Sequence, residues 1–172
     1  MSNLMHDASV KMFGQILRGL DAILDKAASH CGDKKIDPQA IAGARLFPDM
    51  FPLTAQVQLS CDFAVRAAFR LAGQEPPRTP DNEKTFDELK TRIAKALAEI
   101  EGLDVPAFAG SESRSITFPM GPVKNHTMVG STYLFSFAIP NFIFHVTTAY
   151  AILRENGVTL GKRDFMGRLA GM

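Results

Sequence analysis

The segment "PNFIFHVTTAYAILRENG", residues 140–157, is apolar and helix-like in composition, yet it carries Asn141 and His145. Residues four apart on a helix lie one turn apart and point in nearly the same direction. A neutral imidazole inside a protein has to form hydrogen bonds, because an unpaired buried polar group costs about 1–3 kcal/mol. The segment therefore predicts a buried helix with a polar site on one face.

The helix that contains this segment is expected over residues 131–156. Gly157 supplies its left-handed cap, and Pro140 removes one backbone hydrogen bond and is expected to kink it. A second apolar helix is predicted from residue 53 to Gly73, where small side chains along one side allow a neighbouring helix to approach closely.

Two further helices are predicted from apolar residues that recur at three- and four-residue steps. One runs from residue 7 or 9 to residue 29, and the "HCGDKKID" stretch is expected to end it. The other runs from residue 86 to residue 101 and has the clearest amphipathic stripe in the chain. Thr85 and Glu88, just at its start, have the spacing of a capping box.

Shorter elements are predicted between these helices. Asp37-Pro38 reads as a cap followed by a first-turn proline, which opens a short helix to residue 46. Two β-prone runs, residues 115–118 and 126–129, predict a hairpin-like excursion. The fold class is therefore all-α: a four-helix bundle with a short extra helix and a hairpin before the last long helix. One domain is expected over residues 1–172.

The composition is that of a soluble globular protein, with 46% hydrophobic and 22% charged residues. Nineteen basic and 18 acidic side chains give a formal charge of +1, so neither a nucleic-acid partner nor an anionic membrane surface is expected. Residues 133–153 are long enough to span a bilayer, but without flanking basic clusters a bundle helix is the better interpretation. Two cysteines form no disulfide framework, and we expect a cytoplasmic protein.

Partners for His145 are expected from the predicted helix that begins at residue 53. Gln56 and Gln58 are the nearest polar candidates, and Asp62 is a candidate to orient the imidazole from a second layer. A satisfied structural core histidine explains the same pattern equally well. A metal site normally uses three or more His, Cys or carboxylate ligands, and carboxamides bind transition metals poorly.

Three segments in order resemble an uncharacterised bacterial family, known by a domain-of-unknown-function label, of the DinB/YfiT-like superfamily. They are "MHDASVKMFGQIL", "FPLTAQVQLSCDFAVRAAFRLAG" and "PNFIFHVTTAYAILRENGV" with the following "LGKRDFMG". The resemblance covers Met5 to Gly167. It implies a DinB-like four-helix bundle that is often a homodimer. Some superfamily members are thiol-dependent transferases, and others hydrolyse or isomerise small substrates through a metal.

The resemblance also implies a place for a divalent metal, which superfamily members commonly hold through three histidines. His145 falls on the second histidine of a pair four residues apart, and Asn141 takes the place of the first. Gln56 or Gln58 stands near the third. His145 is thus the only matching ligand position, and the Arg-Gly-Gln that usually follows reads Val-Thr-Thr.

The main functional hypothesis is a small-molecule pocket around His145 and Asn141 with a glutamine from the helix that begins at residue 53, and without a tightly held metal. If the protein is an enzyme, His145 is the expected general base, because imidazole titrates near neutral pH. One alternative is a metal-dependent transferase or hydrolase with a degenerate ligand set. The other is a non-catalytic structural or interaction protein.

Overall fold

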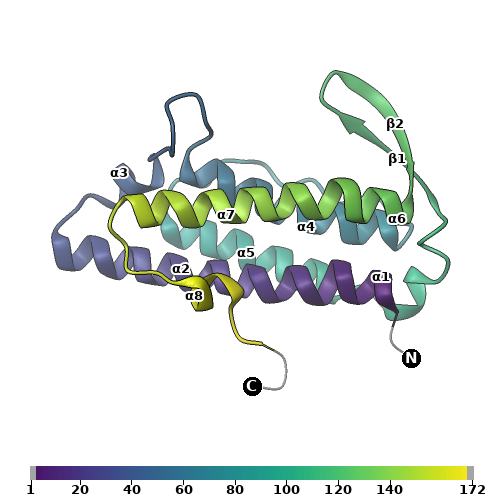
Figure 1. The fold of residues 1–172 in the computed structure, drawn as a ribbon, viewed down its shortest axis with the longest axis horizontal. Coiled ribbons are helices and arrows are strands. Elements are labelled where there is room, and N and C mark those ends of the chain that lie inside the picture. Colours follow the sequence, from purple (N-terminus) through teal and green to yellow (C-terminus); the bar gives the residue numbers. More distant parts are fainter. Residues whose placement is uncertain (1–2, 170–172) are drawn as a thin grey trace.

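The computed structural model describes residues 3–169 and consists of four long helical rods packed side by side, with a hairpin at one end (Figure 1). The first rod is continuous through three labelled elements: α1 (Leu4–His6), a π-helical segment η1 (Asp7–Lys11) and α2 (Met12–Lys34). The second and third rods are α4 (Leu53–Leu71) and α5 (Phe86–Glu101). The fourth comprises α6 (Gly130–Thr132), the π-helical segment η3 (Tyr133–Ala138) and α7 (Ile139–Glu155). The four-helix bundle predicted from the sequence is confirmed.

Smaller elements connect the rods. They are α3 (Pro38–Ala42), the 3-10 helix η2 (Val105–Phe108), the strands β1 (Ser115–Met120) and β2 (Val123–Val129), and α8 (Lys162–Met166). The strands form an antiparallel hairpin, as expected from the two β-prone runs. It projects from the end of the bundle at which the described chain begins (Figure 1). Phe118 of β1 turns inward and packs its ring against Tyr133 and Phe137, which attaches the hairpin to the fourth rod.

The starts of two helices follow from local hydrogen bonds that the sequence predicts. The Thr85 hydroxyl accepts from the Glu88 backbone N–H, and the Glu88 carboxylate accepts from the Thr85 N–H, so both halves of the capping box are present. The Asp37 carboxylate accepts from the Gln39 N–H at the start of α3, with Pro38 as its first residue.

The ends of two helices differ from the prediction. The first rod passes through Gly32 and stops only at Lys35, which has a left-handed backbone with φ of 55°. The Lys35 N–H donates to the carbonyls of Cys31 and Gly32, so the terminal turn is satisfied by a non-glycine residue. Helix α3 ends at Ala42, with Gly43 as its C-cap, rather than at residue 46.

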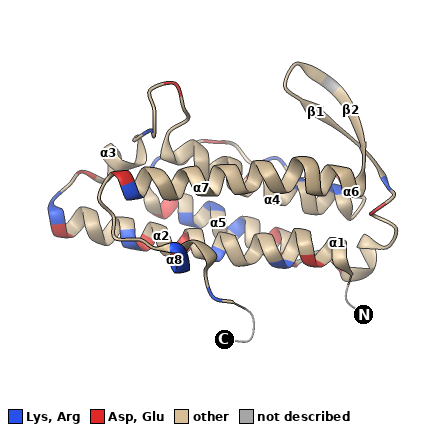
Figure 2. Cartoon of the chain, viewed as in Figure 1, with Lys and Arg blue, Asp and Glu red and all other residues tan. Residues whose placement is uncertain are grey.

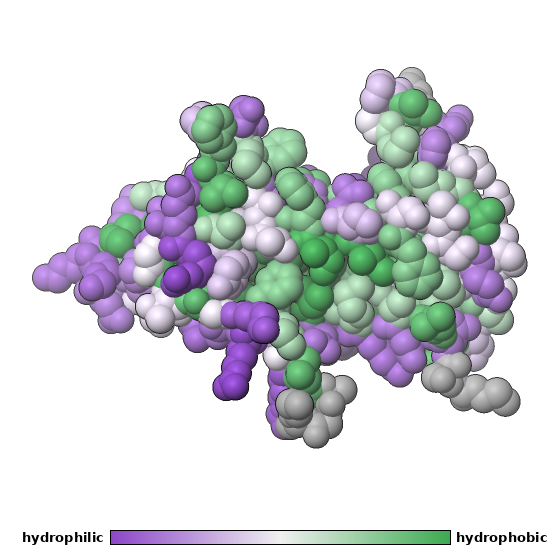
Figure 3. All heavy atoms as spheres, viewed as in Figure 1, coloured by the Kyte–Doolittle hydropathy of each residue, from purple (hydrophilic) through white to green (hydrophobic). Residues whose placement is uncertain are grey.

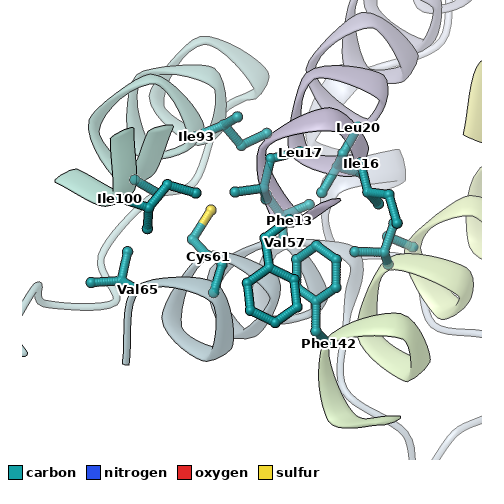
Figure 4. Packing of buried hydrophobic residues seen from close by; sticks show 14 of the residues in the cluster. Phe13, Ile16, Leu17, Leu20, Val57, Cys61, Val65, Ile93, Ile100 and Phe142 are labelled. Atoms are coloured by element: carbon teal, nitrogen blue, oxygen red, sulfur yellow. The ribbon is translucent and has the colours of Figure 1, made fainter. Parts of the chain in front are cut away.

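The core lies between the rods and is built from both aliphatic and aromatic side chains (Figure 4). Phe13 of α2 meets Phe142 of α7 with ring centroids 4.5 Å apart. Cys61 of α4 is fully buried beside them as a free thiol, and burial raises its pKa. It serves as a small hydrophobic residue.

The fourth rod contains a shift in hydrogen-bond register just before its proline. Within η3 the bonds run over five residues rather than four, and the Ile139 N–H donates to the Leu134 carbonyl. Pro140 follows immediately, where an ordinary helix would lose a bond and crowd a carbonyl of the preceding turn. A π-helical turn of this kind widens the helix and accommodates the proline.

The fourth rod is also the one helix among residues 3–169 that is long and apolar enough to cross a membrane by length and composition. It packs against α4 and α2 as a wall of the bundle, and Phe142, Val146, Ala149 and Ile152 are completely buried. Core helices of soluble proteins pass the same test of length and composition.

Candidate functional site

His145 of α7 and Gln56 of α4 are directly bonded. The imidazole Nδ1 lies 2.8 Å from Gln56 Oε1, between helices that run antiparallel side by side. The Gln56 amide nitrogen donates to the Phe51 carbonyl at 3.2 Å, just before α4 begins. Since the glutamine oxygen accepts, Nδ1 carries the hydrogen, and this chain of bonds links α7 through α4 to the segment that leads into it.

The imidazole is held between aromatic rings. Phe63 stacks on it at 5.5 Å with an interplanar angle of 19°, and Phe144 meets it edge-on at 5.3 Å. The residue is 8% exposed, and burial lowers the pKa of His145 below its usual value of 6.5. His145 is therefore neutral near pH 7. Its Nε2 has no hydrogen-bond partner within residues 3–169 and does not belong to the fully enclosed atoms.

Asn141 lies one turn before His145 but has different surroundings. Its amide nitrogen donates to the Phe137 carbonyl at 2.7 Å, within the same helix. The half-buried side chain faces an open cleft of about 650 Å³. Phe63 forms part of the same wall and so stands between the cleft and His145. The hollow expected around both residues is thus lined by Asn141 and not by His145, which packs against the cleft residue Phe63.

The cleft is assembled from four parts of the chain. One wall is α4, another is the start of the fourth rod, and the hairpin turn and the proline-rich loop of residues 74–85 close the remaining sides. Apolar contacts come from Phe63, Phe137 and Met120. Its volume is within the range of about 300–1,000 Å³ that is usual for small-molecule sites.

The cleft contains more positive than negative charge. Its lining includes three arginines, Arg66, Arg70 and Arg78, against one carboxylate, Glu75. Arg70 donates to the Tyr133 hydroxyl at 3.1 Å. Guanidinium groups remain charged at any physiological pH, so this part of the surface is permanently cationic.

Gln58 and Asp62 belong to a different cluster, on the α5 side of α4. Gln58 donates to Glu83 at 3.0 Å, and Asp62 accepts from both Arg66 and Arg92. The expected contacts of Gln58 and Asp62 with His145 are replaced by these. The reason is helical geometry: positions 56 and 58 differ by about 200° around the helix, so they cannot face the same neighbour.

Arg92 is the centre of that cluster. Its side chain is 3% exposed and contacts the carboxylates of Asp62, Asp81 and Glu83, together with the Pro80 carbonyl. These contacts fasten the loop of residues 74–85 to α4 and α5. Although burial acts to raise it, the pKa of Glu83 is lowered overall by hydrogen bonds from its own backbone, Gln58 and Arg92.

Sequence reasoning missed the arginines, although signals for them were present. Arg92 stands within the apolar stripe of α5, three residues after Leu89, where a charge needs buried partners. Arg66 and Arg70 follow Phe63 at steps of three and four on the cleft face of α4. Only the position of the proline-rich loop opposite them makes these residues part of a cleft.

The donor set does not suit the divalent metal that the superfamily resemblance implies. At the corresponding place stand one imidazole and two carboxamides, and both carboxamide nitrogens are committed to backbone carbonyls. Within residues 3–169, no three His, Cys, Asp or Glu side chains lie close enough together to hold a metal ion. Neutral carboxamides are poor ligands for transition metals, so we assign no metal chemistry to these residues.

Residues 5–166 match the model of a domain of unknown function, DUF1993. The chain belongs to this family. A solved structure of a DinB family member protein from Shewanella denitrificans is 37% identical, with a TM-score of 0.91, and the match covers 98% of this chain and 95% of that one. The family is therefore DinB-like, as the resemblance indicates. The comparison with curated proteins gives no match.

Proposed function

We propose that this DUF1993 protein binds a small organic molecule in the cleft between α4, the fourth rod, the hairpin and the loop of residues 74–85. The observation that carries the proposal is the cleft itself: about 650 Å³, lined by Asn141 and by the aromatic rings of Phe63 and Phe137. Ligand sites typically combine apolar walls with a few placed polar groups, and this cleft has both.

For His145 we propose a positioning role. Its ring stacks on Phe63, and its Nδ1 is occupied by Gln56, so the Gln56–His145 bond sets the position of one aromatic wall. A general base has to come within hydrogen-bond reach of the proton that it removes. Phe63 lies between His145 and the cleft, which favours ligand binding over proton transfer as the role of this residue.

The uncharged probe N-phenyl-1-naphthylamine, which fluoresces when it enters an apolar site, tests the proposal. Met120→Trp adds bulk to the cleft from the hairpin, and we expect it to weaken binding at least tenfold. Val123→Trp is the matched control, because Val123 is the strand partner of Met120 but does not line the cleft. Absence of saturable binding to the wild type, or equal weakening by both variants, would contradict the proposal.

We also propose that the protein is a homodimer that associates through the outer face of α7. No Asp, Glu, Lys or Arg occurs between Ser131 and Leu153, and the fourth rod is uncharged up to its C-terminal end (Figure 2). Phe144 is 54% exposed, and Phe51, whose carbonyl accepts from Gln56, is 58% exposed. Hydrophobic residues gather over the middle of this side of the molecule (Figure 3).

A second copy suits this face because a symmetric pair buries the same apolar strip twice and desolvates no charge. Light scattering is expected to give twice the chain mass of 18.8 kDa for the wild type. Phe144→Glu should give one chain mass, and Val105→Glu, at an exposed apolar residue of η2, should leave the dimer intact. A single-chain mass for the wild type at micromolar concentration contradicts the proposal.

We also propose a cytoplasmic location, because a reducing compartment suits the two buried free thiols.

A further inference from the structure

We infer that the ligand of the cleft is a small organic anion with an apolar body, such as an aromatic or aliphatic carboxylate, sulfonate or phosphate. The inference rests on the proposed ligand-binding function and adds the chemical class of the ligand. It depends on how the three cleft arginines are partnered within the protein.

Arg66 is already neutralised. Its guanidinium forms an ion pair with Asp62, one turn earlier on α4, and Asp62 in turn is shared with Arg92. Arg66 therefore contributes little net charge to a ligand, because its carboxylate partner is within the same cluster.

Arg70 has partners without charge. It donates to the Tyr133 hydroxyl at 3.1 Å, and its guanidinium carbon lies 5.6 Å from the Phe118 ring centre and 6.0 Å from that of Tyr133. These contacts hold the planar group in place while no carboxylate compensates it. A guanidinium that is fixed in this way loses less freedom when it binds an oxyanion, so it is preorganised for an anionic group.

Arg78 is the second arginine of the cleft that has no carboxylate partner among the residues that the structure describes. It lies in the proline-rich loop, and no hydrogen bond or ion pair joins it to any residue in the described range 3–169. The same loop is fastened by Arg92, through Asp81 and Glu83. The backbone that carries Arg78 is thus anchored at the cleft, while its side chain is available to a ligand.

This local excess of positive charge differs from the rest of the chain. The protein as a whole is nearly neutral, with 19 basic and 18 acidic residues, and several other cations on the rods have carboxylate partners. Lys26 contacts Asp164, and Lys90 contacts Asp21 and Asp25. Among the described residues, the cleft thus has two guanidinium groups without a carboxylate partner, and Glu75 is the one carboxylate in its lining, so the excess of positive charge is a feature of the site rather than of the composition.

The cleft residues other than the arginines indicate what the uncharged part of the ligand is like. Phe63 and Phe137 present ring surface, and Met120 adds a flexible apolar contact from the hairpin. The Asn141 amide nitrogen is bonded to its own helix, which leaves the carboxamide oxygen as an acceptor for a ligand hydroxyl or amine. An inorganic anion would use the arginines and leave the apolar wall in water, whereas an amphipathic anion uses both.

Two fluorescent probes with the same aromatic skeleton test the inference. N-phenyl-1-naphthylamine is neutral, and 8-anilinonaphthalene-1-sulfonate carries one sulfonate on that skeleton. We expect the wild type to bind the sulfonate at least tenfold more tightly. Arg70→Gln/Arg78→Gln should reduce that ratio to near one, because it weakens binding of the sulfonate far more than binding of the neutral probe. The ratio should also fall as the NaCl concentration rises.

The matched control is Lys162→Gln/Arg163→Gln, which removes two positive charges from exposed residues of α8 and should preserve the ratio. Equal affinities of the wild type for the two probes overturn the anion inference but leave the proposed ligand-binding function intact. The anion inference is also overturned if the affinity ratio of the two probes is the same in Arg70→Gln/Arg78→Gln as in the wild type. Failure of both probes to bind with saturation removes the ligand-binding function itself, so the two failures are distinguishable.

Discussion

Gln56 Oε1 and His145 Nδ1 lie 2.8 Å apart although 89 residues separate them in the chain. The bond crosses the interface of α4 and α7 at a level where both side chains are almost fully buried. Removal of His145 leaves the Gln56 carboxamide oxygen without a donor and Phe63 without the ring that stacks on it. Removal of Gln56 leaves the buried Nδ1 of the imidazole without its acceptor.

His145→Ala is therefore expected to lower the free energy of unfolding by about 2 kcal/mol, the cost of an unpaired buried polar group. Urea denaturation measures the change. Thr147→Ala, at an exposed residue of the same helix, should change it by less than about 0.5 kcal/mol. In a double-mutant cycle with Gln56→Ala the two losses should not add, and additive losses would show that the bond contributes nothing.

Protonation of His145 should destabilise the fold. Burial lowers the pKa of His145 below 6.5, so the unfolded chain binds this proton more readily than the folded one. The free energy of unfolding should fall as the pH decreases below about 6.5 and level off below the depressed pKa. Urea denaturation between pH 7.5 and 5 measures the slope. His145→Gln cannot take up this proton and should show a shallower decrease, whereas identical slopes contradict the prediction.

Removal of the buried guanidinium of Arg92 should be among the most destabilising single changes. Arg92→Leu leaves the mostly buried Glu83 without its cation and Asp62 with Arg66 alone, and breaking a buried ion pair in this way typically costs about 3–5 kcal/mol. Arg66→Gln breaks a half-exposed pair and should cost no more than about 1 kcal/mol.

The loss of Arg92 should also loosen the loop of residues 74–85. In Arg92→Leu it should become the first site of limited proteolysis, because Arg92 holds Pro80, Asp81 and Glu83. The lowered pKa of Glu83 means that its share of this stability is present above its usual pKa of 4.5. It should be lost as the pH falls through the depressed pKa. An unchanged cleavage pattern would argue against this role of Arg92.

Alanine substitutions at two glycines of α2 should change the stability of the protein in opposite directions. A Cβ at Gly19 would lie 2.9 Å from the carbonyl oxygens of Asp164 and Phe165, so Gly19→Ala has to displace α8. At Gly32 a Cβ meets nothing within 4 Å, and Gly32→Ala should stabilise the helix by about 0.4–1 kcal/mol. Thermal unfolding compares the two. A Gly19→Ala protein more stable than the wild type would refute the close approach.

The capping box at the start of α5 should contribute measurably. Thr85→Ala removes the acceptor for the Glu88 N–H and should cost about 1 kcal/mol. Thr91→Ala, inside the same helix, removes a hydroxyl that bonds back to the Asp87 carbonyl and should be neutral or slightly stabilising. Equal losses in the two variants would mean that the cap has no special effect.

Features governed by neighbouring residues could be predicted from the sequence. The capping box of α5 and the Asp37-Pro38 start of α3 depend on residues at most three positions apart. The ends of helices were harder to predict. The first rod continues through Gly32, because a glycine with open space around it does not by itself end a helix. The left-handed turn at Lys35 has no strong sequence signal, since lysine rarely adopts that conformation.

For the site, the sequence by itself determined that α7 carries a polar pair, and that the imidazole needs a partner from another helix. Gln56 and Gln58 remained equal candidates until the rotation of α4 placed the first toward α7 and the second toward Glu83. Only the tertiary structure put Phe63 between His145 and the cleft, and brought Arg78 to the same cleft as Arg70. The spacing of apolar residues along the sequence predicts which face of a helix is buried. A cleft, in contrast, depends on distances between segments that are far apart in the chain.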